Sequence, residues 1–293
     1  RTWCGPRAGK LCYPKRMQRI DGRQLAASMR AELKAQVGTM TTKPGLAIVL
    51  VGNDPASHTY VRLKQRAAQE IGLHFVRCDF PAEASEADVL ARIAALNADP
   101  KIHSIIVQLP LPAPLNADRI VNAIAPAKDA DGFLKASLEK FRTDATALPP
   151  VLCEGIWRLM TSTGEDYAGK RAVVLANSTT FGEPMALLLT RKNLDVQIAY
   201  PPFHNTHALT QAAEVVVIAI GQPRFLKAAD IQSGATLIDV GYTRVADKDV
   251  GDVDATEMAN LSGWLTPVPG GVGPVTVAML LERTVTIASY AQR

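Results

Sequence analysis

The feature that most constrains this chain is a series of short apolar runs, each followed by a stretch with helical periodicity. The run LAIVLV (46–51) has no polar position, which is typical of a strand covered by helices on both faces. After it, Asp54 can cap a helix that has Pro55 at its first position and continues to Ile71. The pattern then predicts strands at 74–78 and 103–109 and helices at 88–97 and 116–125. Because strands alternate with helices, the sheet should be parallel.

The alternation lapses between residues 126 and 150, a stretch of turn residues that suits a domain boundary or a substrate loop. It resumes with strands predicted at 171–176, 195–200, 214–221 and 235–241 and helices at 154–162, 183–193, 206–212 and 275–291. The predicted fold class is therefore α/β, with two doubly wound parallel-sheet domains, the second Rossmann-like, and an interdomain cleft. At 293 residues the chain is long enough for two such cores.

The last helix can return to the first domain, so the predicted domains are 17–150 plus 277–293, and 151–276. Residues 1–16 form a separate extension that is predicted to be disordered, with basic residues and no acidic one. These basic residues account for the net charge of +4, so the body is nearly neutral and has no electrostatic footprint for nucleic acid or an anionic membrane. Glycines and prolines interrupt any helical face in the extension. We interpret it as an unselected upstream or vector-derived segment, with Met17 as the start, rather than as a targeting peptide.

We expect a soluble protein of a reducing compartment. No apolar run approaches the roughly 18 residues that a membrane-spanning helix needs. The four cysteines form no CxxC pair and no metal-ligand spacing, so free thiols and no metal site are expected. The predicted location is the cytoplasm, or the mitochondrion if residues 1–16 are a targeting remnant.

Three polar residues are predicted to converge at the carboxyl edge of the first sheet, where open parallel sheets bind ligands. Tyr60 and Lys64 lie four residues apart on the helix after the first strand, so they share one face, and Gln108 ends the third strand. From spacing alone, the simpler interpretation is a packed helix edge with a lysine that extends to solvent. The pair by itself does not decide between that edge and an active site.

Four longer motifs are more specific: ASHTYVRLKQRAAQEIGL (56–73), IIVQLPLP (105–112), PAKDADGF (126–133) and TPVPGGVGPVTVAMLLE (266–282). In order and spacing they resemble the bifunctional methylenetetrahydrofolate dehydrogenase/cyclohydrolase family, and the resemblance runs from residue 19 to the C-terminus. It implies oxidation of 5,10-methylenetetrahydrofolate with a nicotinamide cofactor, then hydrolysis of the methenyl form to 10-formyltetrahydrofolate. The first domain would bind folate and the second the nucleotide.

The resemblance implies roles for the residues of these motifs. Lys64 resembles the family's catalytic lysine, and burial beside a cation would favour the neutral amine that helps to activate water. Gln108 would orient that amine, and Tyr60 would offer a ring face to the folate. Asp131 would bind the donor edge of the pterin ring, although a turn-forming aspartate before Gly132 is also a sufficient reason for it. Further substrate contacts are expected at Leu109, Pro269, Gly270, Gly271 and Thr276.

The nucleotide-binding motif departs from the family pattern. The family has Gly-Arg-Ser and Val-Gly-Lys-Pro where this chain has ANSTTFGEP (176–184), so Asn177 replaces the arginine and Glu183 the lysine. Tyr200 and Pro201 stand where the family has a His-Ser pair that helps to hold a 2′-phosphate. The resemblance implies NADP and leaves NAD open; because Arg–phosphate pairs are strong, NADP is expected to bind no better than NAD here. The predicted cofactor-binding residues are Asn177, Ser178, Gly182, Pro184, Tyr200, Pro201, Gly221, Gly241 and Gly273.

Three functions remain open from the sequence. They are the bifunctional enzyme with altered cofactor choice, a cyclohydrolase whose nucleotide domain has become a scaffold, and a non-catalytic folate-binding or assembly protein. The intact set of Tyr60, Lys64, Gln108 and Asp131 argues against the third. The expected partners are a reduced folate and a nicotinamide dinucleotide, and the resemblance implies a homodimer formed through the nucleotide domain.

Overall fold

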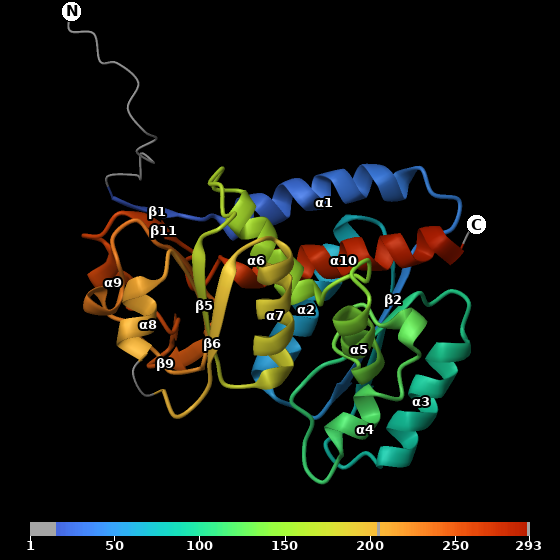
Figure 1. Cartoon of the computed structure of the whole chain (residues 1–293). Coiled ribbons are helices and arrows are strands. Elements are labelled where there is room, and N and C mark those ends of the chain that lie inside the picture. The colour runs from blue at the N-terminus through green and yellow to red at the C-terminus, as the bar shows by residue number, and fades with distance from the viewer. Residues whose placement is uncertain (1–15, 204–205, 292–293) are drawn as a thin grey trace, which may run out of the picture.

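The computed structural model describes residues 16–203 and 206–291 (Figure 1). Apart from Arg16, the extension predicted at 1–16 lies outside the described residues. In the described part of the chain, the strands form a three-stranded sheet, a six-stranded sheet and a two-stranded ribbon, and both larger sheets are parallel. No helix of these residues is both long and apolar enough to cross a membrane. The predicted α/β class with two parallel sheets is therefore confirmed.

The first unit is the three-stranded sheet, in the order β3 (His74–Phe80), β2 (Gly45–Val51), β4 (Ser104–Val107). The central strand β2 is buried along its whole length. Alternate residues of β2 pack with α2 (Pro55–Glu70) on one face, and the residues between them pack with α3 (Glu86–Ala98) and α4 (Ala117–Val121) on the other. A strand covered on both faces needs an apolar side chain at every position, which explains the unbroken run LAIVLV.

The second unit is the six-stranded sheet, in the order β1 (Met17–Arg19), β11 (Gly263–Leu265), β8 (Thr236–Asp239), β7 (Val215–Ala219), β5 (Arg171–Ala176), β6 (Asp195–Ala199). The chain passes from β5 to β6 on one side and then to β7 on the other, so the strand order reverses at β5. Open α/β sheets bind ligands at such a reversal, outside the carboxyl ends of the strands. The sequence places residues 17–19 in the first domain, whereas β1 pairs with β11 at the edge of this second sheet.

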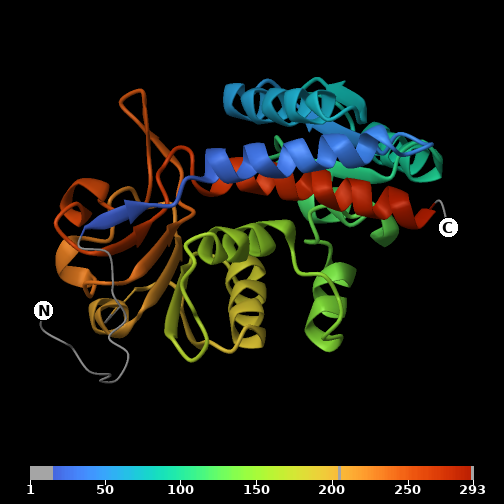
Figure 2. The same ribbon diagram turned by 90° about the horizontal axis from the view of Figure 1, so that it is seen from above.

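Two long helices, α1 (Gly22–Gly38) and α10 (Val272–Ala291), lie side by side and extend across both units (Figure 2). The first half of α1 contributes Met29 to the core of the six-stranded sheet, and its second half contributes Leu33 to the core of the three-stranded sheet. Likewise, α10 contributes Val275 to the first of these cores and Leu281 to the second. Because both helices are anchored in both cores, they fix how the two sheets face each other.

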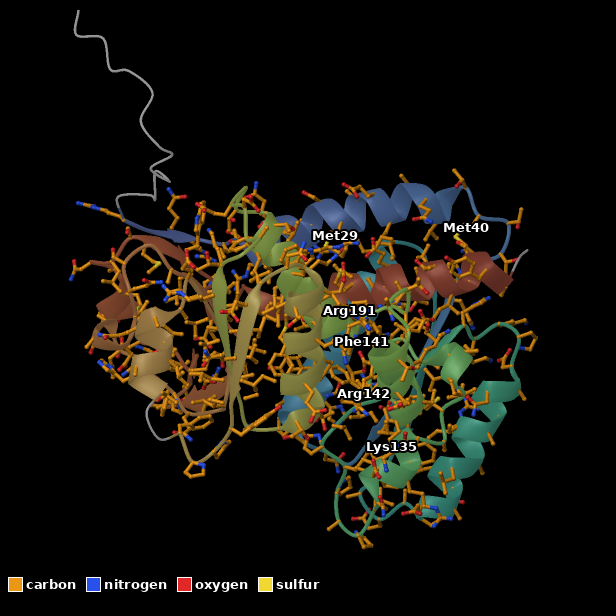
Figure 3. All side chains as sticks on the ribbon, viewed as in Figure 1. Met29, Met40, Lys135, Phe141, Arg142 and Arg191 are labelled. Atoms are coloured by element: carbon orange, nitrogen blue, oxygen red, sulfur yellow. The ribbon has the colours of Figure 1, made fainter. Side chains whose placement is uncertain are left out.

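Residues 126–150 differ from the expected loop because they contain a short 3-10 turn (Pro126–Lys128) and a helix, α5 (Lys135–Thr143). Helix α5 packs on α7 (Thr179–Arg191). The Arg191 guanidinium stacks on the Phe141 ring at 4.4 Å and Nη2 donates to the Phe141 carbonyl oxygen at 2.7 Å, and Figure 3 shows both residues where the two helices meet. The residue before α5 is Leu134, whose side chain cannot cap a helix, so the sequence has no signal for the start of α5.

The remaining elements are α6 (Val151–Thr161), α8 (Thr206–Ala212), a 3-10 turn (Ala228–Asp230), α9 (Ala255–Met258) and an antiparallel hairpin of β9 (Thr243–Val245) and β10 (Lys248–Val250). Neither α1 nor the hairpin is predicted from the sequence. The hairpin strands have three residues each, too few for an alternating pattern to be recognised. The hairpin leaves the carboxyl edge of the six-stranded sheet directly after β8, which places it beside the ligand-binding edge.

Candidate active site

Helix α2 presents Tyr60 and Lys64 at the carboxyl edge of the three-stranded sheet. The helix begins shortly after β2 ends, with Pro55 in its first turn and Asp54 as its cap. The Asp54 carboxylate accepts the Ser57 amide at 2.7 Å, which satisfies one of the free donors at the helix start. Both Tyr60 and Lys64 are partly buried. The lysine therefore does not simply extend into solvent, as the simpler interpretation of the pair requires.

Lys64 is held by Gln108, the residue that follows β4. The Lys64 Nζ donates to Oε1 of Gln108 at 3.1 Å, and Nε2 of Gln108 donates to the Leu109 carbonyl oxygen at 2.8 Å. Because the amide nitrogen has its own acceptor, the amide oxygen is directed at the lysine. The sequence prediction that these two side chains meet at one edge agrees with this geometry.

The segment PAKDADGF contains two aspartates with different tasks. Asp129 organises the loop: its carboxylate accepts the Gly132 amide at 2.8 Å, the Leu134 amide at 3.1 Å and the Ser137 hydroxyl at 2.6 Å. Asp131 uses its backbone carbonyl oxygen to accept the Val151 amide at 3.0 Å. Its carboxyl group is close enough to Lys64 for its charge to raise the pKa of the lysine. The turn-forming role considered for Asp131 thus belongs to Asp129.

Burial controls the charge of this cluster. It lowers the pKa of Lys64 below the ordinary lysine value, and the charge of Asp131 opposes part of that shift. Burial also raises the pKa of Asp131, an effect that Lys64 and Arg283 oppose and Asp129 reinforces. Desolvation therefore moves both groups toward their neutral forms. A lysine with a lowered pKa is more often a free amine near pH 7, the form that can accept a proton.

Tyr60 meets an aromatic residue of the second unit. Its ring lies edge-on to that of Tyr242, with the ring centroids 5.8 Å apart and the planes at 68°. Burial raises the pKa of Tyr60, and interactions with Tyr242 and the charge of Asp249 raise it further. Tyr60 is therefore a neutral phenol at physiological pH.

A pocket of about 340 Å³ lies between the two units beside this cluster. The first unit contributes Leu109 and Asp131 to its wall, and the second contributes Ser178, Thr180 and Phe181 from the start of α7. The pocket brings predicted substrate residues and a predicted cofactor residue to one space. It occupies the cleft that the fold class predicts.

The three glycines at and just before the start of α10 differ in what requires a glycine at each position. A Cβ atom at Gly271 would lie 2.7 Å from Cβ of Thr266, so close packing alone excludes any larger residue. Gly270 has a φ of +112° and lies against Arg23, and it follows Pro269, which is joined to Val268 by a cis peptide bond. At Gly273, by contrast, a Cβ atom would meet no described atom within 4 Å. Packing among the described residues therefore does not explain this third glycine.

Thr276 lies inside α10 rather than at its start, because the helix begins at Val272 and not at Val275. Its hydroxyl donates to the Val272 carbonyl oxygen at 3.1 Å. The hydroxyl is thus engaged within the helix.

Most of the predicted cofactor residues lie at the carboxyl ends of β5, β6, β7 and β8 or in the first turns of α7, whereas Gly273 lies in the first turn of α10. Asn177 follows β5 and donates to the Ile220 carbonyl oxygen at 3.4 Å, and Ser178 caps α7 by accepting the Thr180 amide at 3.1 Å. Pro184 lies within α7. The amide donors at the start of a helix favour an anionic group such as the phosphates of a dinucleotide. The edge therefore retains backbone features suited to a nucleotide.

Tyr200 occupies the end of β6 and packs against the first turns of α7. A Cβ atom at Gly182 would lie 2.7 Å from the Tyr200 hydroxyl oxygen. This oxygen is buried and has no hydrogen-bond partner among the described residues. Pro201 follows, joined to Pro202 by a cis peptide bond. Glu183, on α7, pairs with Arg142 of α5 at 3.6 Å. Tyr200 and Glu183 thus place a phenol and a carboxylate at this corner.

Two buried carboxyl groups tie together the loops after β7 and β8. The Gly221 amide donates to Asp252 at 3.0 Å and the Gly241 amide donates to Asp239 at 2.9 Å. Asp239 also accepts the Asp252 amide at 3.0 Å. Burial raises the pKa of Asp239 to about 7 and raises that of Asp252, whose Oδ1 has no partner among the described residues. These carboxyl groups therefore hold the backbone of the loops that contain Gly221 and Gly241.

Three residues of the site were not singled out from the sequence: Asp129, Arg283 and Tyr242. Asp129 stands in a quoted motif and could have been found there. Arg283 comes from α10, donates to the Pro149 carbonyl oxygen at 2.8 Å and lowers the pKa of Asp131. Arg283 and Tyr242 reach the site from segments far apart in the chain, so no local pattern marks them.

Comparison with known proteins agrees with this geometry. Residues 20–131 match the model of the tetrahydrofolate dehydrogenase/cyclohydrolase catalytic domain, and residues 150–292 match the model of the NAD(P)-binding domain of the same family. Bifunctional protein FolD 2 of Geobacter sulfurreducens is 44% identical over 276 residues, which are 93% of this chain and 97% of that protein.

Two solved structures resemble the whole chain. The bifunctional FolD enzyme of Campylobacter jejuni superposes with a TM-score of 0.89 at 34% identity, covering 94% of this chain and 99% of that one. The Trypanosoma brucei methylenetetrahydrofolate dehydrogenase-cyclohydrolase, complexed with NADP and an inhibitor, gives 0.91 at 34% identity, with 95% and 99% covered. The chain belongs to the tetrahydrofolate dehydrogenase/cyclohydrolase family.

Proposed function

We propose that the cluster around Lys64 serves both steps of the chemistry of this bifunctional family. The enzyme is a methylenetetrahydrofolate dehydrogenase and a methenyltetrahydrofolate cyclohydrolase. In the first step a hydride leaves the one-carbon bridge between two folate nitrogens, and a bound nicotinamide nucleotide supplies the hydride acceptor. In the second, water opens the methenyl cation to the 10-formyl form. The observation that carries the assignment is the 3.1 Å hydrogen bond from Lys64 to Gln108 in a partly buried site.

Lys64 acts as the base of the water step. Its lowered pKa provides the neutral amine, and Gln108 accepts one of its hydrogens, so the amine lone pair is free to face the substrate. The water oxygen bonds to the bridge carbon while a proton passes to Lys64. The bond from that carbon to one ring nitrogen then breaks, and this nitrogen takes up the proton from Lys64. The hydroxyl proton leaves to solvent as the formyl C=O forms, so one proton is released overall. General base catalysis of this kind contributes roughly 10²- to 10⁴-fold in rate.

Asp131 and Tyr60 hold the substrate against the lysine. The Asp131 carboxylate accepts hydrogen bonds from the amino and NH groups of the pterin edge, a charge-assisted contact that fixes ring orientation. The Tyr60 ring, held by Tyr242, provides a flat apolar face. Leu109 lines the pocket, and the segment 269–271 before α10 and Thr276 within α10 provide further substrate contacts. Lys64 and Tyr60 lie one helical turn apart, so the stacked ring and the reacting carbon are positioned together.

The residues that would hold the dinucleotide lie at the carboxyl ends of β5 to β8 and at the starts of α7 and α10: the amides at the start of α7 would receive its phosphates, and Gly221, Gly241 and Gly273 would allow its close approach. NAD is accepted at least as well as NADP. A 2′-phosphate would lie near Glu183, whose charge repels it, and Asn177 offers no positive charge in return. The match to the family's NAD(P)-binding domain covers both nucleotides and does not distinguish between them.

The folate unit of the proposal comprises residues 20–150 with the second half of α10, and the nucleotide unit comprises the six-stranded sheet and its helices. We further propose a homodimer formed through the nucleotide unit, and a cytoplasmic location, on the basis of the family. Light scattering of the purified protein measures its mass in solution, and the mass of a single chain would contradict the homodimer.

One spectrophotometric assay tests the function. Methenyltetrahydrofolate should accumulate from the methylene form with NAD or NADP, and should be consumed when no nucleotide is present. Consumption without formation would leave a cyclohydrolase with a scaffold nucleotide unit. Binding of folate without either reaction would leave a non-catalytic folate-binding protein.

A further inference from the structure

Tyr242 is the first residue after Gly241 and opens the hairpin of β9 and β10. It belongs to the nucleotide unit, yet its ring meets Tyr60 of the folate unit edge-on at 5.8 Å. Nearly half of the Tyr242 surface, 47%, is exposed, so the residue is not simply part of a core. A large exposed aromatic ring next to a substrate-facing ring indicates a role at the site rather than in folding.

The hairpin holds Tyr242 in place through a charged pair. Asp249 on β10 accepts a hydrogen bond from Nη1 of Arg244 on β9 at 2.7 Å, across the antiparallel register that pairs these two residues. Burial is the main reason why the pKa of the Tyr242 phenol is raised, and the interaction of its hydroxyl with the Asp249 carboxylate raises it further. The side chains of Tyr242 and Tyr60 also interact. Tyr242 is thus in contact with its own hairpin through Asp249 and with Tyr60 through its ring.

Tyr60 is partly buried and lacks any other aromatic contact among the described residues. Its position on α2 fixes only its backbone, and the ring can rotate about its side-chain bonds. A neighbouring ring at an angle of 68° limits that freedom. Because Lys64 lies one turn further along the same helix face, a folate bound on the Tyr60 ring lies next to the amine.

We propose that Tyr242 is a positioning residue, which holds the Tyr60 ring at the folate site from the nucleotide unit and thereby sets the affinity for reduced folate. This rests on the proposed function, since it specifies how the same site holds its substrate. Tyr242 does not touch the reacting atoms and acts only through Tyr60.

The test is steady-state hydrolysis of methenyltetrahydrofolate without any nucleotide, so that a change in dinucleotide binding cannot influence the result. Tyr242→Ala should raise KM about 2- to 10-fold, the change expected from the loss of one aromatic pair, and leave kcat within about 2-fold. Tyr242→Phe keeps the aromatic contact but loses the hydroxyl that interacts with Asp249, so its KM should lie between those of the parent and Tyr242→Ala. Val245→Ala is the matched control, because Val245 lies on the same hairpin, is 42% exposed and makes no ring contact.

The decisive comparison is made in a Tyr60→Ala background. If Tyr242 acts through Tyr60, adding Tyr242→Ala there should change KM no further. An unchanged KM in the single variant, or full additivity in the double variant, would overturn the proposal. An inactive parent protein would instead remove the proposed function itself, so the two failures are distinguishable. Thermal melts of every variant confirm that folding is unaffected, and a melt lowered as much in Tyr242→Phe as in Tyr242→Ala would also count against a positioning role.

Discussion

On the folate side of the cleft, functional side chains contact one another: Lys64 bonds to Gln108 and faces Asp131. On the nucleotide side, the predicted residues bond mainly to backbone or serve packing. Asn177 donates to a carbonyl oxygen, Ser178 caps a helix and Tyr200 fills the space over Gly182. One wall is thus a preorganised cluster of side chains, and the other is a backbone cradle.

The difference shows where substitution is tolerated. The backbone groups at strand and helix ends persist when side chains change, so we expect Asn177, Glu183 and Tyr200 to alter nucleotide preference without removing the binding surface. A cluster that acts through shifted pKa values depends on each side chain, because the shift of one group depends on the charge of the next. Four substitutions test this contrast.

Lys64→Met should have the largest effect. It keeps the length and apolar contacts of the lysine stem and removes the amine that accepts the proton. We expect hydrolysis of methenyltetrahydrofolate to fall by about 10³-fold or more, since catalysis by a positioned base is lost together with its hydrogen bond. The thermal melt should be unchanged or higher, because a desolvated amine is removed. Near-normal hydrolysis would exclude the lysine from the mechanism.

Asp131→Asn should raise KM for folate about 10- to 100-fold, because a charge-assisted contact becomes a neutral one. The charge of Asp131 raises the pKa of Lys64, so its removal should also move the hydrolysis pH profile to lower pH. The neighbouring Asp129→Asn is the control: it disturbs a carboxylate with three hydrogen-bond donors, and should lower the melting temperature instead. If both variants behave alike, the division of tasks between the two aspartates is wrong.

Glu183→Lys should improve binding of NADP relative to NAD by about 3- to 10-fold, because it reverses the charge near the expected 2′-phosphate. Glu139→Lys is the matched control, since Glu139 also pairs with Arg142, at 2.9 Å, but lies on α5 away from the strand ends. Calorimetric titration with each nucleotide gives the ratio. A clear preference of the parent protein for NADP would contradict the premise.

Asp252→Asn should have the smallest effect of the four, a rise in melting temperature that depends on pH. Asp239 has a folded-state pKa of about 7 against an ordinary value of 3.8, so the folded state binds its proton more tightly than the unfolded state. The stability that this proton contributes is complete below pH 4 and is lost as the pH rises toward 7. Removing the charge of Asp252 lowers the pKa of Asp239 and lessens that loss. The melting temperature of the variant should therefore gain about 2–4 °C on the parent between pH 5 and pH 8; a constant difference would show that the two groups are not coupled.

Much of the fold is predictable from local chemistry. The strand at 171–176, the helix at 206–212, and the cap and first residue of α2 are observed as predicted, because burial on both faces and helix capping leave clear patterns. The start of α7 lies four residues earlier than predicted, at Thr179, because Ser178 caps it before apolar periodicity begins. Helix α5 and the hairpin depend on contacts with distant segments and leave no such pattern.

The site follows the same division. Lys64 and Gln108 are placed correctly by helix spacing and strand ends, while Arg283 and Tyr242 enter from the last helix and the second unit. Family resemblance identifies Asp131, but only the structure shows that Asp129 forms the turn. At Gly182 and Gly241 the glycines have packing reasons that a motif cannot reveal: added Cβ atoms would lie 2.7 Å from the Tyr200 hydroxyl and 2.2 Å from the Asp252 carboxyl carbon.

The pH dependence of nucleotide-free methenyltetrahydrofolate hydrolysis, corrected for the uncatalysed reaction, tests the central claim most directly. A neutral Lys64 predicts that kcat rises through a pKa below the ordinary lysine value of about 10.4, and that this ionisation disappears in Lys64→Met. An ionisation at or above that value, or one that persists in the variant, would contradict the account.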